Sequence, residues 1–189
     1  MKKGLLIVYS GPSGVGKGTI LKEVFKNSEL NITYSVSMTT RSPRDGEVNG
    51  KDYFFVSKDE FEQAIKEDKF LEHARYVDNY YGTPRDYVEK MRNEGHNVVL
   101  EIDIQGGLQI IKKCPDAISI FILPPSIEEL RERLVGRGTE QEETINKRVS
   151  QAENEIKQGE VYKYHVVNDD LDKSISEVES IIKKEMNND

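Results

Sequence analysis

A glycine-rich segment near the N-terminus has the residue types and spacing of a phosphate-binding loop. Residues 11–17 read Gly-Pro-Ser-Gly-Val-Gly-Lys, which fits G-x-x-x-x-G-K, and they directly follow a short apolar run. Glycines let backbone N–H groups turn inward around phosphate oxygens, and a helix starting after the loop adds partial positive charge. Lys17 can reach the β- and γ-phosphates. The residues predicted to contact a nucleoside triphosphate here are Gly11, Pro12, Ser13, Gly14, Val15, Gly16, Lys17, Gly18 and Thr19.

The residue after the lysine departs from the commonest form of this motif. Gly18 stands where Ser or Thr usually gives Mg²⁺ a hydroxyl ligand, and Thr19 follows. We therefore expect Mg²⁺ to keep more of its waters and to rest on the triphosphate, with Thr19 bonded to the α-phosphate. A GTP-hydrolysing switch would need an Asn-Lys-x-Asp guanine clamp. Asn146-Lys147 continues instead with Arg148-Val149, which disfavours that class.

Short apolar runs alternate with helical patterns along the chain. The runs cover residues 5–9, 98–102, 117–123 and 165–167. Continuous apolar runs of this length are typical of parallel strands buried on both faces. The chain is therefore predicted to be an α/β protein whose parallel sheet is flanked by helices. Glu101 and Asp103 lie at the end of the second run, at the edge where such sheets bind ligands.

Two segments interrupt this alternation. Residues 33–83 carry strand patterns at 33–37 and 53–56, joined by a polar loop, and predict a small β-rich insertion. Residues 126–158 form two polar helical stretches around Gly136-Arg137-Gly138, which is typical of a mobile helical lid. The core of this single domain would then comprise about 1–32, 84–125 and 159–189.

Several helix starts are marked by a hydroxyl followed three residues later by a carboxylate. The predicted capping boxes are Ser57 with Glu60, Ser126 with Glu129, and Thr139 with Glu142. Thr83 precedes Pro84, which predicts that Thr83 caps a further helix.

The composition is that of an ordinary globular protein. Of the 189 residues, 36% are hydrophobic and 32% charged, with a formal net charge of −7. This acidic balance disfavours a nucleic-acid-binding protein, because phosphate backbones select basic surfaces. The single cysteine, Cys114, excludes an internal disulfide. The first apolar run is too short for a signal peptide and no stretch could span a membrane, so we expect a cytoplasmic protein.

Beyond the phosphate loop, several segments resemble the guanylate kinase family. They are residues 35–53, 70–72, 79–83, 103–106, 136–140, 146–148 and 167–169. They follow one another over nearly the whole chain, so the resemblance is specific. It implies a P-loop NTPase-type fold with a β-rich GMP-binding insertion and a helical lid. It also implies transfer of the γ-phosphoryl group of ATP to GMP, with Mg²⁺ as the cofactor accompanying ATP.

The resemblance implies that the insertion binds GMP. The residues matching the phosphate-binding positions of the family are Arg41, Arg44, Tyr53 and Tyr81. Those matching its guanine-binding positions are Ser37, Glu72 and Thr83. One carboxylate can accept both the N1–H and N2–H₂ donors of guanine, whereas adenine would face it with a lone pair. Taken alone, the tyrosines fit core packing equally well. Glu101 and Asp103 match positions near the acceptor, with Asp103 holding Mg²⁺ through water.

The implied reaction needs no general base. The second pKa of a phosphate monoester is about 6, so the attacking oxygen of GMP is largely ionised at neutral pH. Catalysis would come from alignment and from neutralising charge on the transferred group. The residues implied for this are Lys17, Arg41, Arg137 and Arg148. Arg137 and Asn168 complete the implied ATP site, and the lid arginines would arrive only on closure.

The sequence also admits two rival interpretations. Guanylate-kinase-like modules of scaffold proteins bind peptides, but they typically have an eroded phosphate loop, whereas Lys17 is present here. A kinase for another nucleoside monophosphate is disfavoured by Glu72 together with Ser37. The sequence is compatible with a monomer and with a homo-oligomer.

Overall fold

The computed structural model describes residues 2–76, 78–136 and 141–188. Its centre is a five-stranded sheet in the order β2-β7-β1-β8-β9, in which every neighbouring pair is parallel. The strands are β1 (Leu6–Ser10), β2 (Ile32–Tyr34), β7 (Asn97–Glu101), β8 (Ile118–Leu123) and β9 (Tyr164–Val167). The predicted α/β fold with a parallel sheet is confirmed.

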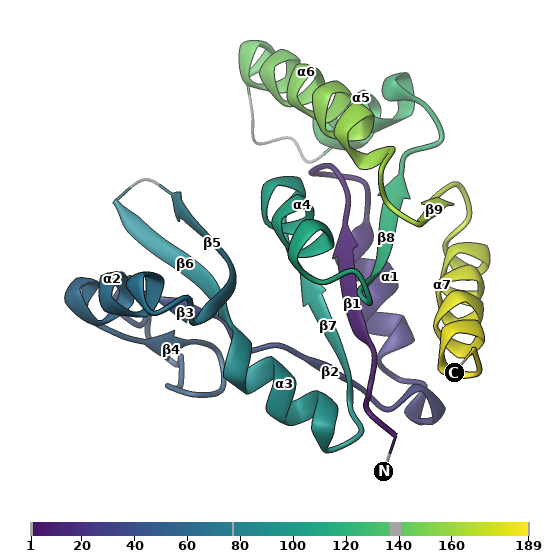
Figure 1. Ribbon diagram of the computed structural model, residues 1–189. Coiled ribbons are helices and arrows are strands. Elements are labelled where there is room, and N and C mark those ends of the chain that lie inside the picture. The colour runs from purple at the N-terminus through teal and green to yellow at the C-terminus, as the bar shows by residue number, and fades with distance from the viewer. Residues whose placement is uncertain (1, 77, 137–140, 189) are drawn as a thin grey trace.

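The central strand β1 shows why the apolar runs are continuous. Leu6 and Val8 belong to one apolar cluster while Ile7 and Tyr9 belong to another, because successive side chains point to opposite faces of the sheet. On the Ile7 face pack α1 (Lys17–Val24) and α7 (Leu171–Met186). On the Leu6 face pack α3 (Arg85–Asn93) and α4 (Ile104–Lys113) (Figure 1). Each side chain of β1 is therefore buried.

Parallel pairing brings the carboxyl ends of neighbouring strands to one edge of the sheet. Tyr9 of β1 pairs with Glu101 of β7, and Ser10 pairs with Phe121 of β8. The backbone N–H of Asn168, just after β9, donates to the carbonyl of Leu123 at 2.8 Å. The glycine-rich loop after β1 thus lies between the segments that follow β7 and β9.

A second sheet stands beside the first, in the order β4-β3-β6-β5. It contains β3 (Met38–Thr39), β4 (Phe54–Phe55), β5 (Phe70–Tyr76) and β6 (Asn79–Pro84), with α2 (Lys58–Lys66) packed against it. The single strand expected over residues 33–37 was wrong. Ile32–Tyr34 pairs with β7 in the central sheet, where Tyr34 also stacks on Phe25 at 4.0 Å between ring centroids, and the second sheet begins only at Met38.

Two helices, α5 (Ile127–Val135) and α6 (Glu142–Gly159), stand over the carboxyl edge of the central sheet (Figure 1). They share a small apolar cluster of their own, formed by Leu130, Leu134, Ile145 and Ala152. Because this cluster is separate from the two central ones, the pair holds together as a unit. No helix of the part described is long and apolar enough to cross a membrane.

The helix starts agree only partly with the predicted caps. The Ser57 hydroxyl accepts from the Glu60 N–H and Glu60 returns a bond to the Ser57 N–H, so this capping box is confirmed. Ser126 accepts from the Glu129 N–H at 3.1 Å, as expected of a cap. Thr83 does not cap α3: Pro84 holds the N-cap position without a side-chain bond. Thr139 lies outside the described residues, and α6 starts after Gln141.

Candidate active site

The phosphate loop has the backbone conformation that its glycines predict. It joins β1 to α1, and Gly14 and Gly16 have φ angles of 85° and 90°, a region that favours glycine. A Cβ atom at Gly16 would lie 2.6 Å from Nδ2 of Asn168. Gly16 is therefore required both by its backbone angle and by a close neighbour.

The first turn of α1 is anchored from below. The Tyr9 hydroxyl, fully buried in β1, donates to the backbone carbonyl of Lys17 at 2.9 Å. Burial, with the nearby Glu101 carboxylate, raises the pKa of Tyr9 well above its usual range, so the phenol stays a neutral donor. Lys17 is half-buried, and Thr19, in the first turn of α1, is exposed.

Two exposed carboxylates lie at the end of β7, Glu101 as its last residue and Asp103 two residues later. Oε1 of Glu101 lies close to Gly18: a Cβ atom added to Gly18 would be 3.5 Å from this oxygen, an ordinary van der Waals contact. Asp103 caps α4, accepting from the Gly106 N–H through Oδ1 at 2.9 Å. Carboxylate oxygens are the donors that a hard cation such as Mg²⁺ prefers, usually through retained waters. Across the described residues, no three His, Cys, Asp or Glu side chains form a metal-binding group.

Glu72 is the buried carboxylate of the site. Only 7% of the residue is exposed, and Oε1 accepts from the Thr83 hydroxyl across the β5–β6 pair at 2.6 Å. This bond, and not a helix cap, is the role of Thr83 in the structure. Burial raises the pKa of Glu72, although the Thr83 bond opposes that shift. A Cβ atom at Gly106 would lie 2.9 Å from Oε2, so the start of α4 packs directly on the carboxylate.

A cavity of about 180 Å³ is lined by Thr83, the partner of Glu72. Among its lining residues are four of those expected to bind GMP, namely Ser37, Tyr53, Thr83 and Glu101. They come from the second sheet and from the end of β7, so the cavity lies where the two sheets meet.

The Arg41 guanidinium is held end-on by a carboxylate that sequence reasoning missed. Nη1 and Nη2 donate to the two oxygens of Glu47 at 2.9 and 2.8 Å, and Glu47 also accepts from the Arg44 N–H at 2.7 Å. The hydrogen bonds between Arg41 and Glu47 lower the pKa of Glu47 to about 2 and raise the pKa of Arg41. The only signal for Glu47 was its place within the segment that resembles the family.

The two tyrosines expected at the phosphate of GMP lie next to this arginine. The Arg41 guanidinium lies over the Tyr53 ring at 5.4 Å, and the Tyr53 and Tyr81 rings meet edge to face at 6.3 Å between centroids. Arg41, Tyr53 and Tyr81 therefore form one group, while the Arg44 residue is exposed beside it.

The residues of the predicted lid are only partly described. Arg137 lies outside the described residues. Arg148 is half-buried on α6, in the helical pair over the sheet edge. A cavity of about 570 Å³ lies where this pair joins the core, lined by residues that include Leu123, Ser126 and Ile156. None of the predicted site residues lines it.

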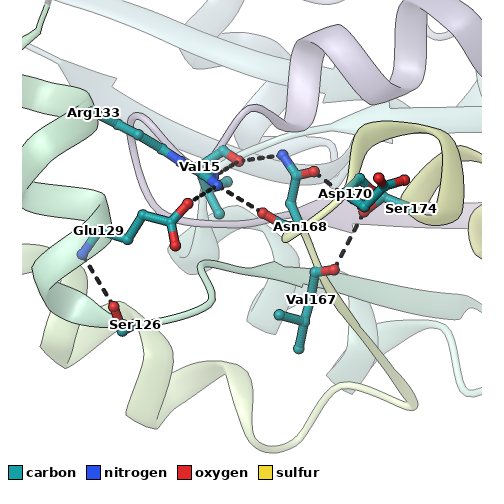
Figure 2. Close-up of polar contacts among 8 residues, drawn as sticks. All are labelled: Val15, Ser126, Glu129, Arg133, Val167, Asn168, Asp170 and Ser174. Atoms are coloured by element: carbon teal, nitrogen blue, oxygen red, sulfur yellow. Dashed lines mark hydrogen bonds and ion pairs between the residues drawn. The ribbon is translucent and has the colours of Figure 1, made fainter.

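Asn168 lies against the phosphate loop. Its Nδ2 donates to the Val15 carbonyl at 2.8 Å, and the residue is 9% exposed. Arg133 of α5, which sequence reasoning missed, donates through Nη2 to the Asn168 carbonyl at 2.9 Å and through Nη1 to the Val15 carbonyl at 3.4 Å (Figure 2). It also pairs with Glu129 one turn earlier at 2.6 Å. The only sequence signal was this i, i+4 pair of opposite charges, which is common on helix surfaces.

The parallel sheet, the loop between β1 and α1, and ligand-facing residues at one sheet edge define a P-loop nucleotide-binding protein. Comparison with known proteins narrows this class. The family model for guanylate kinase matches residues 3–185. The chain therefore belongs to the guanylate kinase family and is a nucleoside monophosphate kinase.

Two solved structures illustrate the similarity. The guanylate kinase from Anaplasma phagocytophilum is 35% identical, with a TM-score of 0.72 over 97% of this chain and 87% of that one. The shikimate kinase from Bacteroides thetaiotaomicron is 13% identical, with a TM-score of 0.51 over 95% of this chain and 98% of that one. The second similarity concerns the fold alone.

Proposed function

We propose that this enzyme transfers the γ-phosphoryl group of ATP to GMP in a Mg²⁺-dependent reaction, giving ADP and GDP. The observation that carries this proposal is Glu72, a buried carboxylate that is bonded to Thr83 of the cavity wall and packs against the start of α4. Because it can accept both adjacent donors of guanine, it favours GMP over AMP as acceptor.

The two substrates would approach from opposite sides of the sheet edge. ATP phosphates would lie in residues 11–19, with Lys17 on the β- and γ-phosphates. The GMP phosphate would be held by Arg41, Arg44, Tyr53 and Tyr81, and its base by Ser37, Glu72 and Thr83. Glu101 would contact GMP from the end of β7. The contacts among Arg41, Tyr53 and Tyr81 support this assignment, because they form a single cationic and phenolic group.

The acceptor phosphate needs no base, since it is largely ionised at neutral pH. Lys17, Arg41, Arg137 and Arg148 would align the two phosphates and neutralise charge on the transferred group. Mg²⁺ bound with ATP would neutralise charge on the β- and γ-phosphates, and Asp103 would hold it through water.

The proposal divides the chain by role. Residues 33–83 would bind GMP, residues 126–158 would form the lid, and the rest would be the core. Closure of the lid would bring its arginines to the phosphates and exclude water. The enzyme would serve guanine nucleotide synthesis and recycling in the cytoplasm.

The direct test is ADP formation from MgATP with GMP, with AMP or without an acceptor. We expect rapid ADP formation only when GMP is the acceptor. Lys17→Ala should lower kcat/KM by at least about 100-fold, the effect of removing one donor from a developing charge. Lys22→Ala, which removes a lysine from the exposed side of the same helix, is the matched control.

The outcomes separate the rival interpretations. Turnover with AMP in place of GMP would mean that Glu72 does not select guanine. ATP binding without turnover on any acceptor, or no ATP binding at all, would move the protein to the class of interaction modules.

A further inference from the structure

We propose that Asn168 and Arg133 are positioning residues that hold the Val15–Gly16 peptide with its N–H turned toward the ATP phosphates. The inference deepens the proposed function, on which it rests, because it explains how the phosphate loop is kept in its binding conformation before ATP arrives.

The argument begins with the geometry of one peptide group. Peptides are planar, and the described residues contain no cis bond, so the Gly16 N–H points away from the Val15 carbonyl. A phosphate loop binds through N–H groups that point into the loop. Whatever holds the Val15 carbonyl outward therefore aims the Gly16 N–H inward.

Two donors from different parts of the chain hold that carbonyl. Nδ2 of Asn168, after β9, donates to it at 2.8 Å, and Nη1 of Arg133, on α5, approaches it at 3.4 Å (Figure 2). A carbonyl oxygen only accepts, so Asn168 must present its NH₂ group and not its Oδ1. The Ser174 hydroxyl has one proton and three acceptors within reach: this Oδ1 and the Val167 carbonyl at 3.2 Å, and the Asp170 carbonyl at 2.8 Å.

Helix α5, the first helix of the proposed lid, also packs closely against the phosphate loop. A Cβ atom at Gly14 would lie 2.8 Å from Cδ2 of Leu134, so α5 packs directly on the loop next to Arg133. Arg133 in turn is fixed by Glu129 at 2.6 Å and by the Asn168 carbonyl at 2.9 Å. Because α5 is the first helix of the lid pair, the loop conformation is tied to the base of the lid.

The decisive variant is Asn168→Asp, which keeps the shape of the side chain but replaces its donor by an acceptor. A carboxylate would repel the Val15 carbonyl and attract the Gly16 N–H, and so favour the flipped peptide. We expect ADP to bind about 10- to 100-fold more weakly, the effect of one lost and one misdirected hydrogen bond. The KM for GMP should stay within about 2-fold, because the GMP residues lie in another part of the chain.

A second variant keeps the inference testable if the first folds poorly. Arg133→Met keeps the apolar stem without the donors and should weaken ADP binding about 5- to 20-fold. Arg133→Lys should recover part of that loss. Lys22→Met, which removes a positive charge from α1 away from the loop, controls for electrostatics.

Three measurements read the result: calorimetric titration with ADP, thermal unfolding without nucleotide, and the ¹H–¹⁵N resonance of Gly16. In the wild type, ADP should shift the Gly16 amide strongly, and in Asn168→Asp this shift should be largely lost. An unchanged Gly16 shift with ADP affinity within about 2-fold would overturn the inference. So would equal losses for ADP and GMP accompanied by lower thermal stability, which indicate general damage. Failure of the proposed function would look different: wild-type protein would bind ADP but show no GMP-dependent turnover.

Discussion

The sharpest prediction concerns Glu72→Gln. The variant keeps the size of the side chain, and its amide oxygen can still accept from the Thr83 hydroxyl that contacts Glu72 at 2.6 Å. Guanine would lose one charge-assisted bond and would meet an NH₂ group where it presents its own donor. A bond to a charged group contributes about 1.5–3 kcal/mol, and an unpaired buried donor costs about 1–3 kcal/mol. We therefore expect a loss of about 3–4 kcal/mol, or roughly 100- to 1,000-fold in kcat/KM for GMP.

The assay is the initial rate of ADP formation with GMP varied at saturating MgATP, and then with ATP varied at saturating GMP. The KM for ATP should stay within about 2-fold, because the phosphate loop follows β1 of the central sheet whereas Glu72 lies on β5 of the second sheet. Glu94→Gln makes the same chemical change on the exposed end of α3 and is the matched control. Losses of equal size for GMP and ATP, or no loss for GMP, would refute the assignment of Glu72 to guanine.

Two further predictions test the same region. Glu47→Gln should raise the KM for GMP about 5- to 30-fold, because Arg41 would lose its two-bond support and ordering a long side chain costs about 1–2 kcal/mol. Initial rates with GMP varied would measure this KM, and Glu23→Gln, which alters the exposed pair of Glu23 with Lys26, is the control. Tighter GMP binding by Glu47→Gln would mean that Glu47 competes with the phosphate of GMP for Arg41. The raised pKa of Glu72 also predicts that affinity for GMP falls on acidification above the ordinary Glu value of 4.5, since only the ionised form accepts both guanine donors. The second pKa of GMP is about 6 with any variant, so the test is the difference between the pH profiles of wild type and Glu72→Gln. This difference in GMP affinity should be largest at high pH, where Glu72 is ionised. A difference that vanishes at high pH would contradict the reasoning.

The same pKa shift carries a sign for stability. A carboxyl whose pKa is raised on folding holds its proton more tightly in the folded state than in the unfolded state. The contribution of Glu72 to the free energy of unfolding therefore decreases as pH rises from the ordinary Glu value of 4.5 through the raised one. Glu72 is in this sense a cost to the fold at neutral pH, as expected of a residue retained for binding.

The central sheet was predictable because its physical cause is local. A strand buried on both faces must be apolar at every position, and β1 places alternate residues in two different clusters. The start of the insertion was not predictable in the same way. Residues 32–34 and 38–39 are both short and half-buried, and only pairing with β7 assigns the first to the central sheet.

The errors at single residues have a common cause. Thr83 before Pro84 is a good local cap, but the partner that it bonds is Glu72, which approaches across the β5–β6 pair. Asn168 and Arg133 meet Val15 from 153 and 118 residues away. Such contacts depend on how elements pack, and a local pattern carries no record of them. The resemblance to the family predicted an ATP-site role for Asn168 but gave no indication that its amide faces the loop.

A protein of net charge −7 that binds two polyanions must concentrate its positive potential, and the structure suggests how. Part of that potential comes from backbone N–H groups, which carry no net charge and need only be aimed. At each of the two proposed substrate sites an arginine is paired with a nearby glutamate, Arg41 with Glu47 and Arg133 with Glu129. Each carboxylate lowers the local positive charge yet orders a long side chain in advance. An arginine side chain that is ordered before binding loses less conformational entropy on binding. These glutamates would therefore favour accurate placement of phosphate over maximal electrostatic attraction.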